Sequence, residues 1–294
     1  MIARIPRDVL EGVIELLGLN DPSSIVDFSF AGGGCINSGG KIKTTDGNFF
    51  LKWNDQKKFP HMFQAESRGL NLLLQQKTIR IPQVHGFGER GPHQFLVLEY
   101  IEQKSKSKTY WQDLGMQLAS LHNATATSFG LDHDNFIGSL SQFNQQHQSW
   151  VDFFIEQRLN VQLKNAIDHG HLNSSWTKKF ELLYARLPEL LPLEKPALLH
   201  GDLWSGNLIT DEKGAPCLVD PAVYFGNREV DLAMTKLFGG FREEFYKSYH
   251  QVSPLPPGFY RRVDIYNLYP LLVHVNLFGG SYIYSVEEIM RTFI

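Results

Sequence analysis

Apolar residues recur along this chain with two different periods, and the first hundred residues favour short strands. The runs at 25–30 and 36–44 have strand length and stand on either side of a glycine-rich turn. Further apolar, aromatic runs follow at 49–53 and 95–101. The pattern predicts a β-rich amino-terminal region.

Helical spacing appears elsewhere in the sequence. Pro6 and Gly18 bracket a short amphipathic segment, as expected for the first turn and the end of a helix. After residue 109, the segments 110–122 and 150–166 place apolar residues at helical intervals, namely Leu114, Leu118, Leu121, Val151, Phe154, Ile155 and Leu159. We interpret these stripes as core. The polar, glutamine-rich segment 135–148 predicts a surface loop.

Composition excludes several protein classes. Of the 294 residues, 43% are hydrophobic and 20% charged, as in globular proteins, and a chain of this length can form two lobes that share a cleft. The net charge of −3 argues against a nucleic-acid partner. Two cysteines, no signal-peptide pattern and no apolar run of membrane-spanning length predict a cytoplasmic protein without a membrane partner.

The most informative feature is a set of three polar residues at fixed intervals. Asn207 follows Asp202 by five residues, and Asp220 follows Asn207 by thirteen. Protein kinases use the same two intervals between the base of the catalytic loop, the metal-binding Asn and the metal-binding Asp. Leu208, Ile209, Leu218 and Val219 flank a turn at 211–214, which predicts a hairpin whose ends come together.

This residue set suits phosphoryl transfer, which requires positioning and charge neutralisation. Asp202 would accept the proton of the attacking hydroxyl, and Asn207 and Asp220 would hold Mg²⁺ through oxygen ligands.

Further kinase features are present upstream. Lys52 is a lone cation inside an apolar strand, where it would contact the α- and β-phosphates of ATP, and Glu66 on the following helix is its expected partner. The glycine-rich turn would present backbone N–H groups to the phosphates. Its predicted nucleotide-binding residues are Gly32, Gly33, Gly34, Cys35, Ile36 and Asn37.

The apolar strand that ends near residue 101 leads into a polar segment at 102–109. We expect a hinge here, in which backbone groups of Glu99, Tyr100 and Ile101 contact adenine. The predicted organisation is an amino-terminal lobe at 1–101, a connector at 102–109 and a carboxy-terminal lobe at 110–294.

The chain resembles the fructosamine (ketosamine) kinases, a branch of the small-molecule kinases that includes aminoglycoside and choline kinases. The resemblance extends over most of the sequence, and its most specific segments are HGDLWSGN at 200–207 and DPAVYFGNREVDLAM at 220–234. Other matching segments are GGGCIN at 32–37, FLKWN at 50–54, MFQAESRGLNLL at 62–73 and NLFGGSY at 276–282.

This resemblance implies an α+β, two-lobed, protein-kinase-like fold, with a small β-rich amino-terminal lobe, a larger helical carboxy-terminal lobe and the ATP site in the cleft between them. It also implies ATP- and Mg²⁺-dependent phosphorylation of the sugar O3 hydroxyl of ketosamines, free or protein-bound. The 3-phosphate is unstable and releases the amine, so the activity reverses glycation.

Departures from protein kinases are informative. Gly201 stands where many protein kinases have an Arg that binds a phosphorylated activation loop, and Pro221-Ala222 follows the metal Asp in place of Phe-Gly. A constitutively competent kinase is expected. Trp204 is either a wall for the sugar or a packing residue. His200 and Asp231 are expected to support the catalytic loop by hydrogen bonding.

Two alternatives stay open at this stage. One is another hydroxyl acceptor on the same fold: an aminoglycoside needs an acidic pocket, whereas the last 45 residues hold only Asp264, Glu287 and Glu288 as acids, and choline needs an aromatic cage, for which tyrosines are numerous. The other is a catalytically silent nucleotide-binding module, which would have no need of Asp202. The sequence does not select the sugar or the oligomeric state.

Overall fold

The computed structural model describes residues 5–31 and 37–294. The chain forms two compact units: the first is Met1–Tyr110 with Ile209–Asp220, and the second is Trp111–Leu208 with Pro221–Ile294. The segment Ile209–Asp220 of the first unit thus lies outside the range 1–101 expected for the smaller lobe. The predicted lobe and connector boundaries stay a prediction.

The first unit is built on a five-stranded antiparallel sheet with the strand order β1-β2-β3-β5-β4. Its strands are β1 Ile25–Phe30, β2 Ser38–Thr44, β3 Gly47–Asp55, β4 Val84–Arg90 and β5 His93–Glu99. A short 3-10 helix, Pro22–Ser24, precedes β1. The predicted strands are present, but β5 ends at Glu99 rather than at residue 101, because its ladder with β3 ends at the Phe49–Glu99 pair.

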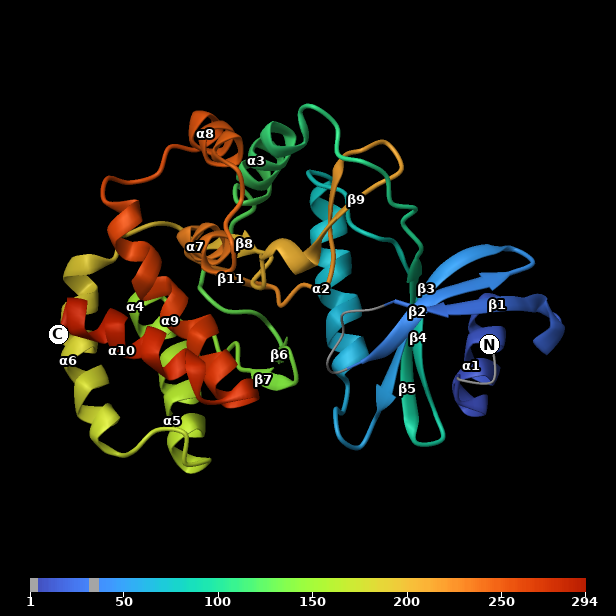
Figure 1. The fold of residues 1–294 in the computed structure, drawn as a ribbon, viewed down its shortest axis with the longest axis horizontal. Helices are drawn as coiled ribbons and strands as arrows, with labels where there is room; N and C mark the ends of the chain where they lie inside the picture. The colour runs from blue at the N-terminus through green and yellow to red at the C-terminus, as the bar shows by residue number, and fades with distance from the viewer. Residues whose placement is uncertain (1–4, 32–36) are drawn as a thin grey trace. The chain divides into compact units, whose positions relative to one another are not determined.

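Helices α1 (Arg7–Leu17) and α2 (Met62–Gln76) lie on opposite faces of this sheet (Figure 1). Side chains of a strand alternate between the two faces. In β3, Leu51 and Trp53 therefore pack into the core that α1 covers, whereas Lys52 points to the other face, toward Glu66 of α2. Helix α1 ends as predicted, with Gly18 in the left-handed conformation at φ 63°.

The predicted hairpin is present as β9 (Leu208–Thr210) and β10 (Pro216–Leu218). Its turn is held by Asp211, whose Oδ1 accepts hydrogen bonds from the backbone N–H groups of Lys213 and Ala215, both at 2.8 Å. The N–H of Leu218 donates to the carbonyl of Arg80, which ties the hairpin to the rest of the first unit.

The second unit is mainly helical (Figure 1). Helix α9 is the centre of its core: most of its residues are buried, and it packs against α5, α7 and α10. The helices are α3 Tyr110–Leu121, α4 Trp150–Phe153, α5 Asn160–Asp168, α6 Ser175–Leu190, α7 Glu229–Leu237, α8 Glu243–Val252, α9 Phe259–Phe278 and α10 Ser281–Phe293. A π-helical segment, Phe154–Leu159, joins α4 to α5, so the segment predicted as a helix at 150–166 is helical throughout.

Two small antiparallel pairs complete this unit, β8 (Ala197–Leu199) with β11 (Tyr224–Gly226), and β6 (Asn135–Ile137) with β7 (Leu140–Gln142). The prediction of a surface loop at 135–148 is wrong. The segment contains the β6–β7 hairpin, and Asn135, Gln142 and Asn144 are buried because backbone carbonyls and neighbouring amides satisfy their polar atoms.

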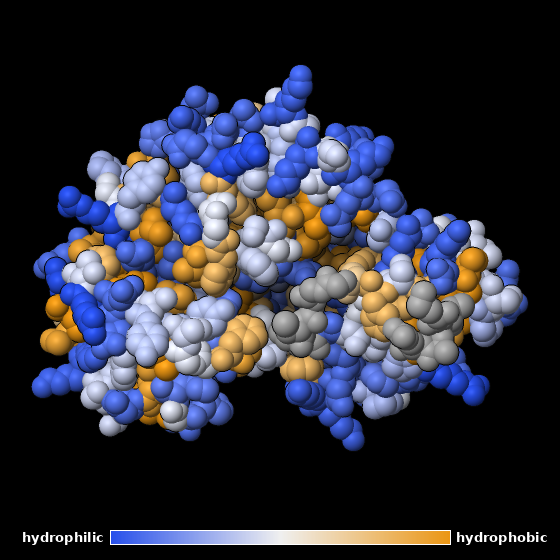
Figure 2. All heavy atoms as spheres, viewed as in Figure 1, coloured by the Kyte–Doolittle hydropathy of each residue, from blue (hydrophilic) through white to orange (hydrophobic). Residues whose placement is uncertain are grey.

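Polar and charged residues cover much of the face shown in Figure 2, with apolar residues scattered among them. Within the described ranges, none of the helices combines the length and the apolar character that a bilayer crossing requires.

Candidate active site

The catalytic loop predicted around Asp202 follows β8 and belongs to the second unit. Asn207 ends a short 3-10 helix, Ser205–Asn207, and its Nδ2 donates to both the carbonyl oxygen and the Oδ2 of Asp202, at 2.9 and 2.8 Å. The N–H of Trp204 donates to the same Asp202 carbonyl, and the N–H of Asn207 donates to the carbonyl of Trp204. The five-residue interval thus closes a tight loop that fixes the Asp202 carboxylate.

Asp231 holds the other side of this loop. Its Oδ2 accepts the backbone N–H of His200 at 2.8 Å, and its Oδ1 accepts the N–H of Gly201 at 2.9 Å. His122 also contacts Asp231 through Nε2, at 3.2 Å. Burial raises the pKa of Asp231. The hydrogen bond from His122, the electrostatic interactions with His122 and His200 and the hydrogen bond from the backbone N–H of Gly201 outweigh burial and lower this pKa. A buried carboxylate therefore orients the backbone directly before Asp202.

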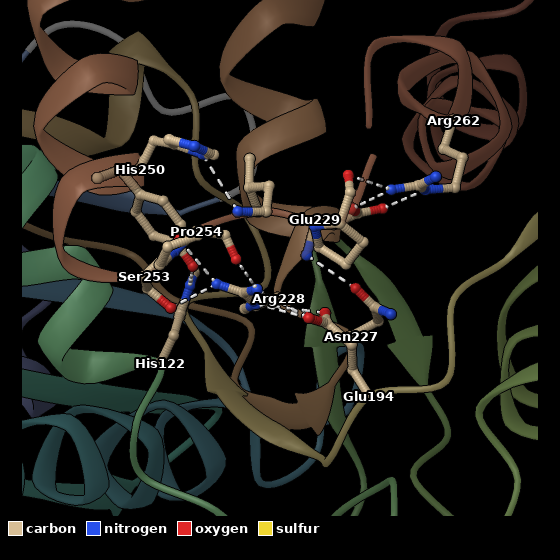
Figure 3. Close-up of polar contacts among 12 residues, drawn as sticks. His122, Glu194, Asn227, Arg228, Glu229, His250, Ser253, Pro254 and Arg262 are labelled. Atoms are coloured by element: carbon tan, nitrogen blue, oxygen red, sulfur yellow. Dashed lines mark hydrogen bonds and ion pairs between the residues drawn. The ribbon is translucent and has the colours of Figure 1, made fainter. Parts of the chain in front are cut away.

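Two ion pairs fix the start of α7, the helix that carries Asp231. Arg228 contacts both carboxylate oxygens of Glu194 and the carbonyls of Ser253 and Pro254 (Figure 3). Glu229, which is fully buried, pairs with Arg262 through two hydrogen bonds of 2.7 and 2.6 Å. Both pairs are bidentate and shielded from solvent, so they set the position of α7 better than exposed pairs would.

Gly201 is required by its surroundings. Its φ is +80°, and a Cβ built on it would lie 2.0 Å from the carbonyl oxygen of Ala222. The N–H of Ala222 in turn donates to the carbonyl of His200 at 2.9 Å. An Arg at this position, as in many protein kinases, would be excluded by both the backbone conformation and the close contact.

A second group of predicted residues lies in the first unit. Nζ of Lys52 lies 2.7 Å from Oε1 of Glu66 and 2.5 Å from Oδ1 of Asp220. The Lys52 and Glu66 side chains are only 8% and 12% exposed, whereas that of Asp220 is half exposed. The predicted Lys–Glu pair is therefore formed, and the same ammonium contacts the Asp that is expected to bind metal.

The charge state of Lys52 follows from these two neighbours. Burial alone would lower its pKa, but the carboxylates of Asp220 and Glu66 raise it well above the usual range. Lys52 is consequently a fixed cation. Asp220 has a φ of +55°, which is uncommon for a residue other than glycine and is typical of functional positions that the surrounding structure holds in place.

Most of the predicted phosphate-binding turn, Gly32, Gly33, Gly34, Cys35 and Ile36, lies outside the described residues. Asn37 is described: its Oδ1 accepts a hydrogen bond of 2.8 Å from Nδ2 of Asn54, at the end of β3. This contact ties the residue after the turn to the strand that carries Lys52.

The predicted adenine-binding residues follow β5. The Glu99 side chain pairs with Arg80 and accepts the backbone N–H of Gln83 at 3.1 Å, so it is occupied within the first unit. Tyr100 lies beneath the ammonium of Lys41, whose Nζ is 4.2 Å from the ring centre, and Ile101 is buried. The backbone N–H of Glu99 also donates to the carbonyl of Gln83, at 2.8 Å. The groups left for the predicted adenine contact are therefore the Glu99 carbonyl and the backbone of Tyr100 and Ile101.

Trp204 belongs to a group of aromatic side chains in the second unit. It is 36% exposed, and its ring lies over Gly206, where a Cβ would come within 2.3 Å of ring atoms. The ring meets Phe238 edge to face at 6.1 Å, and Phe238 lies 4.8 Å from His274. His274 also contacts Phe278 and Tyr282, which extends the group along α9 and α10.

The predicted metal ligands suit a hard cation. Because Nδ2 of Asn207 donates twice to Asp202, its amide is oriented with Oδ1 as the atom that can ligate a metal. Asp220 offers a half-exposed carboxylate. Among the residues described, three or more His, Cys, Asp or Glu side chains nowhere gather as a metal site. An amide oxygen and a carboxylate are each ligand types that Mg²⁺ accepts in proteins.

Several supporting residues carry no recognisable motif in the sequence. His122, Arg228 and Arg262 act through partners distant in sequence, and only their pairing with acids could have signalled them. The polar sequence pattern places Gln142 in a surface loop, whereas its side chain donates to the carbonyl of Ala222, next to the catalytic loop.

Comparison with known proteins agrees with the predicted family. The family model for fructosamine kinase matches residues 16–294. A probable ketoamine kinase from Synechocystis is 40% identical over 275 residues, which cover 92% of this chain and 91% of that protein. A chloroplastic protein-ribulosamine 3-kinase from Arabidopsis thaliana is 38% identical, over 92% of this chain and 84% of its own length.

The fold agrees as well. The crystal structure of a putative fructosamine-3-kinase from Thermobifida fusca superposes with a TM-score of 0.87 at 32% identity, covering 98% of both chains. The match extends through both units, and the α+β fold class predicted from the sequence is confirmed.

Proposed function

Because this chain belongs to the fructosamine kinase family, we propose that it transfers the γ-phosphoryl group of ATP to the O3 hydroxyl of a ketosamine, the sugar adduct of an amine. The position of transfer is supported by the name of the Arabidopsis relative, a protein-ribulosamine 3-kinase. Loss of the 3-phosphate would then release the free amine, so the enzyme would reverse glycation in an ATP-containing cytoplasm.

The observation that carries this proposal is the hydrogen-bonded pair of Asp202 and Asn207. A module that only bound nucleotide would not need a carboxylate that accepts an amide hydrogen bond inside a loop closed by two backbone hydrogen bonds. In the proposed reaction, Asp202 accepts the proton of the O3 hydroxyl as its oxygen forms a bond to phosphorus, and ADP leaves with the electrons of the broken P–O bond.

The remaining charged residues would bind the nucleotide. Lys52 is held as a cation by Glu66 and Asp220 and is suited to contact the α- and β-phosphates. Asn207 and Asp220 would hold Mg²⁺, which supplies neutralisation of the phosphate charge. The backbone near Tyr100 and Ile101 would contact adenine, and Asn37 would support the phosphate-binding turn through Asn54.

The aromatic group around Trp204 suits a ketosamine acceptor. Its exposed ring offers an apolar face for a sugar or for the attached amine. Burial lowers the pKa of His274, so this member of the group is neutral at neutral pH and does not repel an ammonium. We therefore expect Trp204 to border the acceptor and to select for ketosamines.

An acceptor panel tests the proposal. Purified protein is supplied with ATP, Mg²⁺ and one acceptor at a time, and ADP formation is followed. We expect turnover with the fructose and ribulose adducts of an acylated lysine, and none with an aminoglycoside or choline. Turnover that is confined to one of the latter two would replace the ketosamine as the substrate class.

A further inference from the structure

The β6–β7 hairpin contacts the chain next to the catalytic loop through two buried amides. Nε2 of Gln142 donates to the carbonyl of Ala222 at 3.0 Å, and Nδ2 of Asn135 donates to the carbonyl of Val223 at 2.8 Å. Gln142 is 1% exposed and Asn135 is 5% exposed. At such burial, a lost donor leaves a carbonyl without a partner, which is costly.

These two amides are part of a longer chain of hydrogen bonds that begins at Arg158. The guanidinium is fully buried, and its Nη2 donates to Oδ1 of Asn144 at 2.7 Å. Nδ2 of Asn144 donates to Oδ1 of Asn135 at 3.0 Å, and that oxygen also accepts Nε2 of Gln142 at 2.8 Å. The other end is Tyr269, whose hydroxyl meets Oε1 of Gln142 at 2.8 Å.

The direction of this chain is fixed by its first member. A guanidinium can only donate hydrogen bonds, so Asn144 must present its oxygen to Arg158 and its NH₂ group to Asn135. The oxygen of Asn135 then faces two donors, and its own NH₂ group is left to donate to Val223. The same argument orients Gln142, whose NH₂ group must face Ala222. A buried cation thus determines that two N–H donors point at two backbone carbonyls.

The peptide that receives these donors adjoins the catalytic loop. The N–H of Ala222 donates to the carbonyl of His200, two residues before Asp202. The carbonyl of Ala222 lies where a side chain on Gly201 would have to be. Any shift of Ala222 would consequently move His200 and Gly201, the residues that lead into Asp202.

We propose that the chain Arg158–Asn144–Asn135–Gln142–Tyr269 is a polar clamp that positions the catalytic loop for phosphoryl transfer, with Gln142 as its principal positioning residue. None of these side chains needs to contact a substrate. The clamp acts by fixing the Ala222 peptide against His200 and Gly201, so that the Asp202 carboxylate is held in a reactive orientation. The inference rests on the proposed function, because the reaction defines the orientation that matters.

The test is a comparison of Gln142→Met with wild type. Methionine has a similar length but donates no hydrogen bond, so the Ala222 carbonyl loses its partner. We expect kcat to fall on the order of 10- to 100-fold, because a small misplacement of a catalytic group lowers the rate by this much. The KM for ATP should be nearly unchanged. Gln145→Met, on an exposed residue of the same segment, should leave both constants unchanged.

A milder variant covers the case in which Gln142→Met fails to fold. Tyr269→Phe removes only the hydroxyl that orients the Gln142 amide and should lower kcat by a smaller factor. Because both residues act through one clamp, the double variant should be no slower than Gln142→Met alone. If Gln142→Met does not fold, a lower kcat in Tyr269→Phe at unchanged melting temperature supports the clamp, and a wild-type kcat contradicts it.

Two outcomes would overturn the clamp: a wild-type kcat in folded Gln142→Met, whether or not its melting temperature is lower, or multiplied effects in the double variant. Failure of the proposed function looks different, because the wild-type protein itself would not phosphorylate any ketosamine. All clamp measurements are therefore made with whichever acceptor the wild type phosphorylates.

Discussion

Nζ of Lys52 lies 2.5 Å from Oδ1 of Asp220, although the two residues are 168 positions apart in the sequence. This contact joins the central strand of the sheet to the residue just after the β9–β10 hairpin. It also places the positive charge of Lys52 beside the carboxylate of Asp220, a residue whose backbone has the uncommon positive φ. The cation that is expected to bind nucleotide and the carboxylate that is expected to bind metal are thus an ion pair within the first unit.

Asp220→Ala should abolish activity at millimolar Mg²⁺. Since Asp220 would be the charged metal ligand and Asn207 its neutral companion, the variant should weaken Mg²⁺-ATP binding more than binding of metal-free ATP. Calorimetric titration with and without Mg²⁺ measures both affinities, and Glu212→Ala on the exposed turn of the same hairpin is the control. Equal loss of the two affinities would refute metal ligation.

Asp202→Asn should lower kcat on the order of 10²- to 10⁴-fold, the usual contribution of a general base. The amide can still accept the hydrogen bond from Asn207, so the loop and the affinity for ATP should be retained. Steady-state kinetics together with nucleotide titration give both quantities, with Asp264→Asn on the surface as the control. A rate near that of wild type would remove Asp202 from the reaction.

The hydrogen bonds to Asp231 predict a specific dependence of stability on pH. The pKa of Asp231 in the folded protein lies below its ordinary value of 3.8. Its contribution to the free energy of unfolding is therefore complete above about pH 4 and is lost as the pH falls through the lower folded value. Asp231→Asn should cost about 1–3 kcal/mol at pH 7, because the amide cannot accept every hydrogen bond that the buried carboxylate accepts, and this difference should shrink in acid.

Chemical denaturation at a series of pH values measures this difference. Asp168→Asn, which changes an exposed acid, should run parallel to wild type. A difference between wild type and Asp231→Asn that stayed constant from neutral pH into strong acid would mean that folding does not lower the pKa of Asp231.

Trp204→Ala should raise the KM for the ketosamine and leave the KM for ATP nearly unchanged. Aromatic contacts of this kind contribute about 0.5–1.5 kcal/mol, so we expect a change of roughly 2- to 12-fold, partly restored in Trp204→Phe. Phe87→Ala, at an exposed aromatic residue of β4, is the control. An unchanged KM for the acceptor would leave Trp204 as a packing residue over Gly206.

Local patterns in the sequence were sufficient to predict the strand, the helix and the hairpin that carry the candidate site residues. The strand around Lys52, the helix of Glu66 and the hairpin before Asp220 are each defined by apolar runs and turn residues close together in the chain. The Lys52–Glu66 pair could be predicted because kinases pair the strand lysine with a Glu on the helix that follows. The contact of Lys52 with Asp220 could not be predicted from local patterns, because it depends on how the β9–β10 hairpin packs against the five-stranded sheet.

The β6–β7 segment shows why other parts could not be predicted. Its asparagines and glutamines look solvent-exposed, because polarity alone does not reveal a buried partner. Gln142 and Asn135 are buried only because carbonyls at 222 and 223 accept their hydrogen bonds, 80 and 88 residues away. Arg158 is fully buried for a similar reason, with Asn144 and the Phe143 carbonyl as its acceptors.

The most direct test of the account is to identify the product formed from ATP, Mg²⁺ and a fructosyl-lysine or ribulosyl-lysine derivative. Phosphorus–proton correlation by NMR locates the phosphate on the sugar, and the same sample reports the later appearance of free lysine amine. We predict a phosphate on O3, followed by release of the amine and inorganic phosphate, with neither product formed by Asp202→Asn. Phosphorylation at another sugar position, or ATP consumption without a phosphorylated ketosamine, would contradict the account.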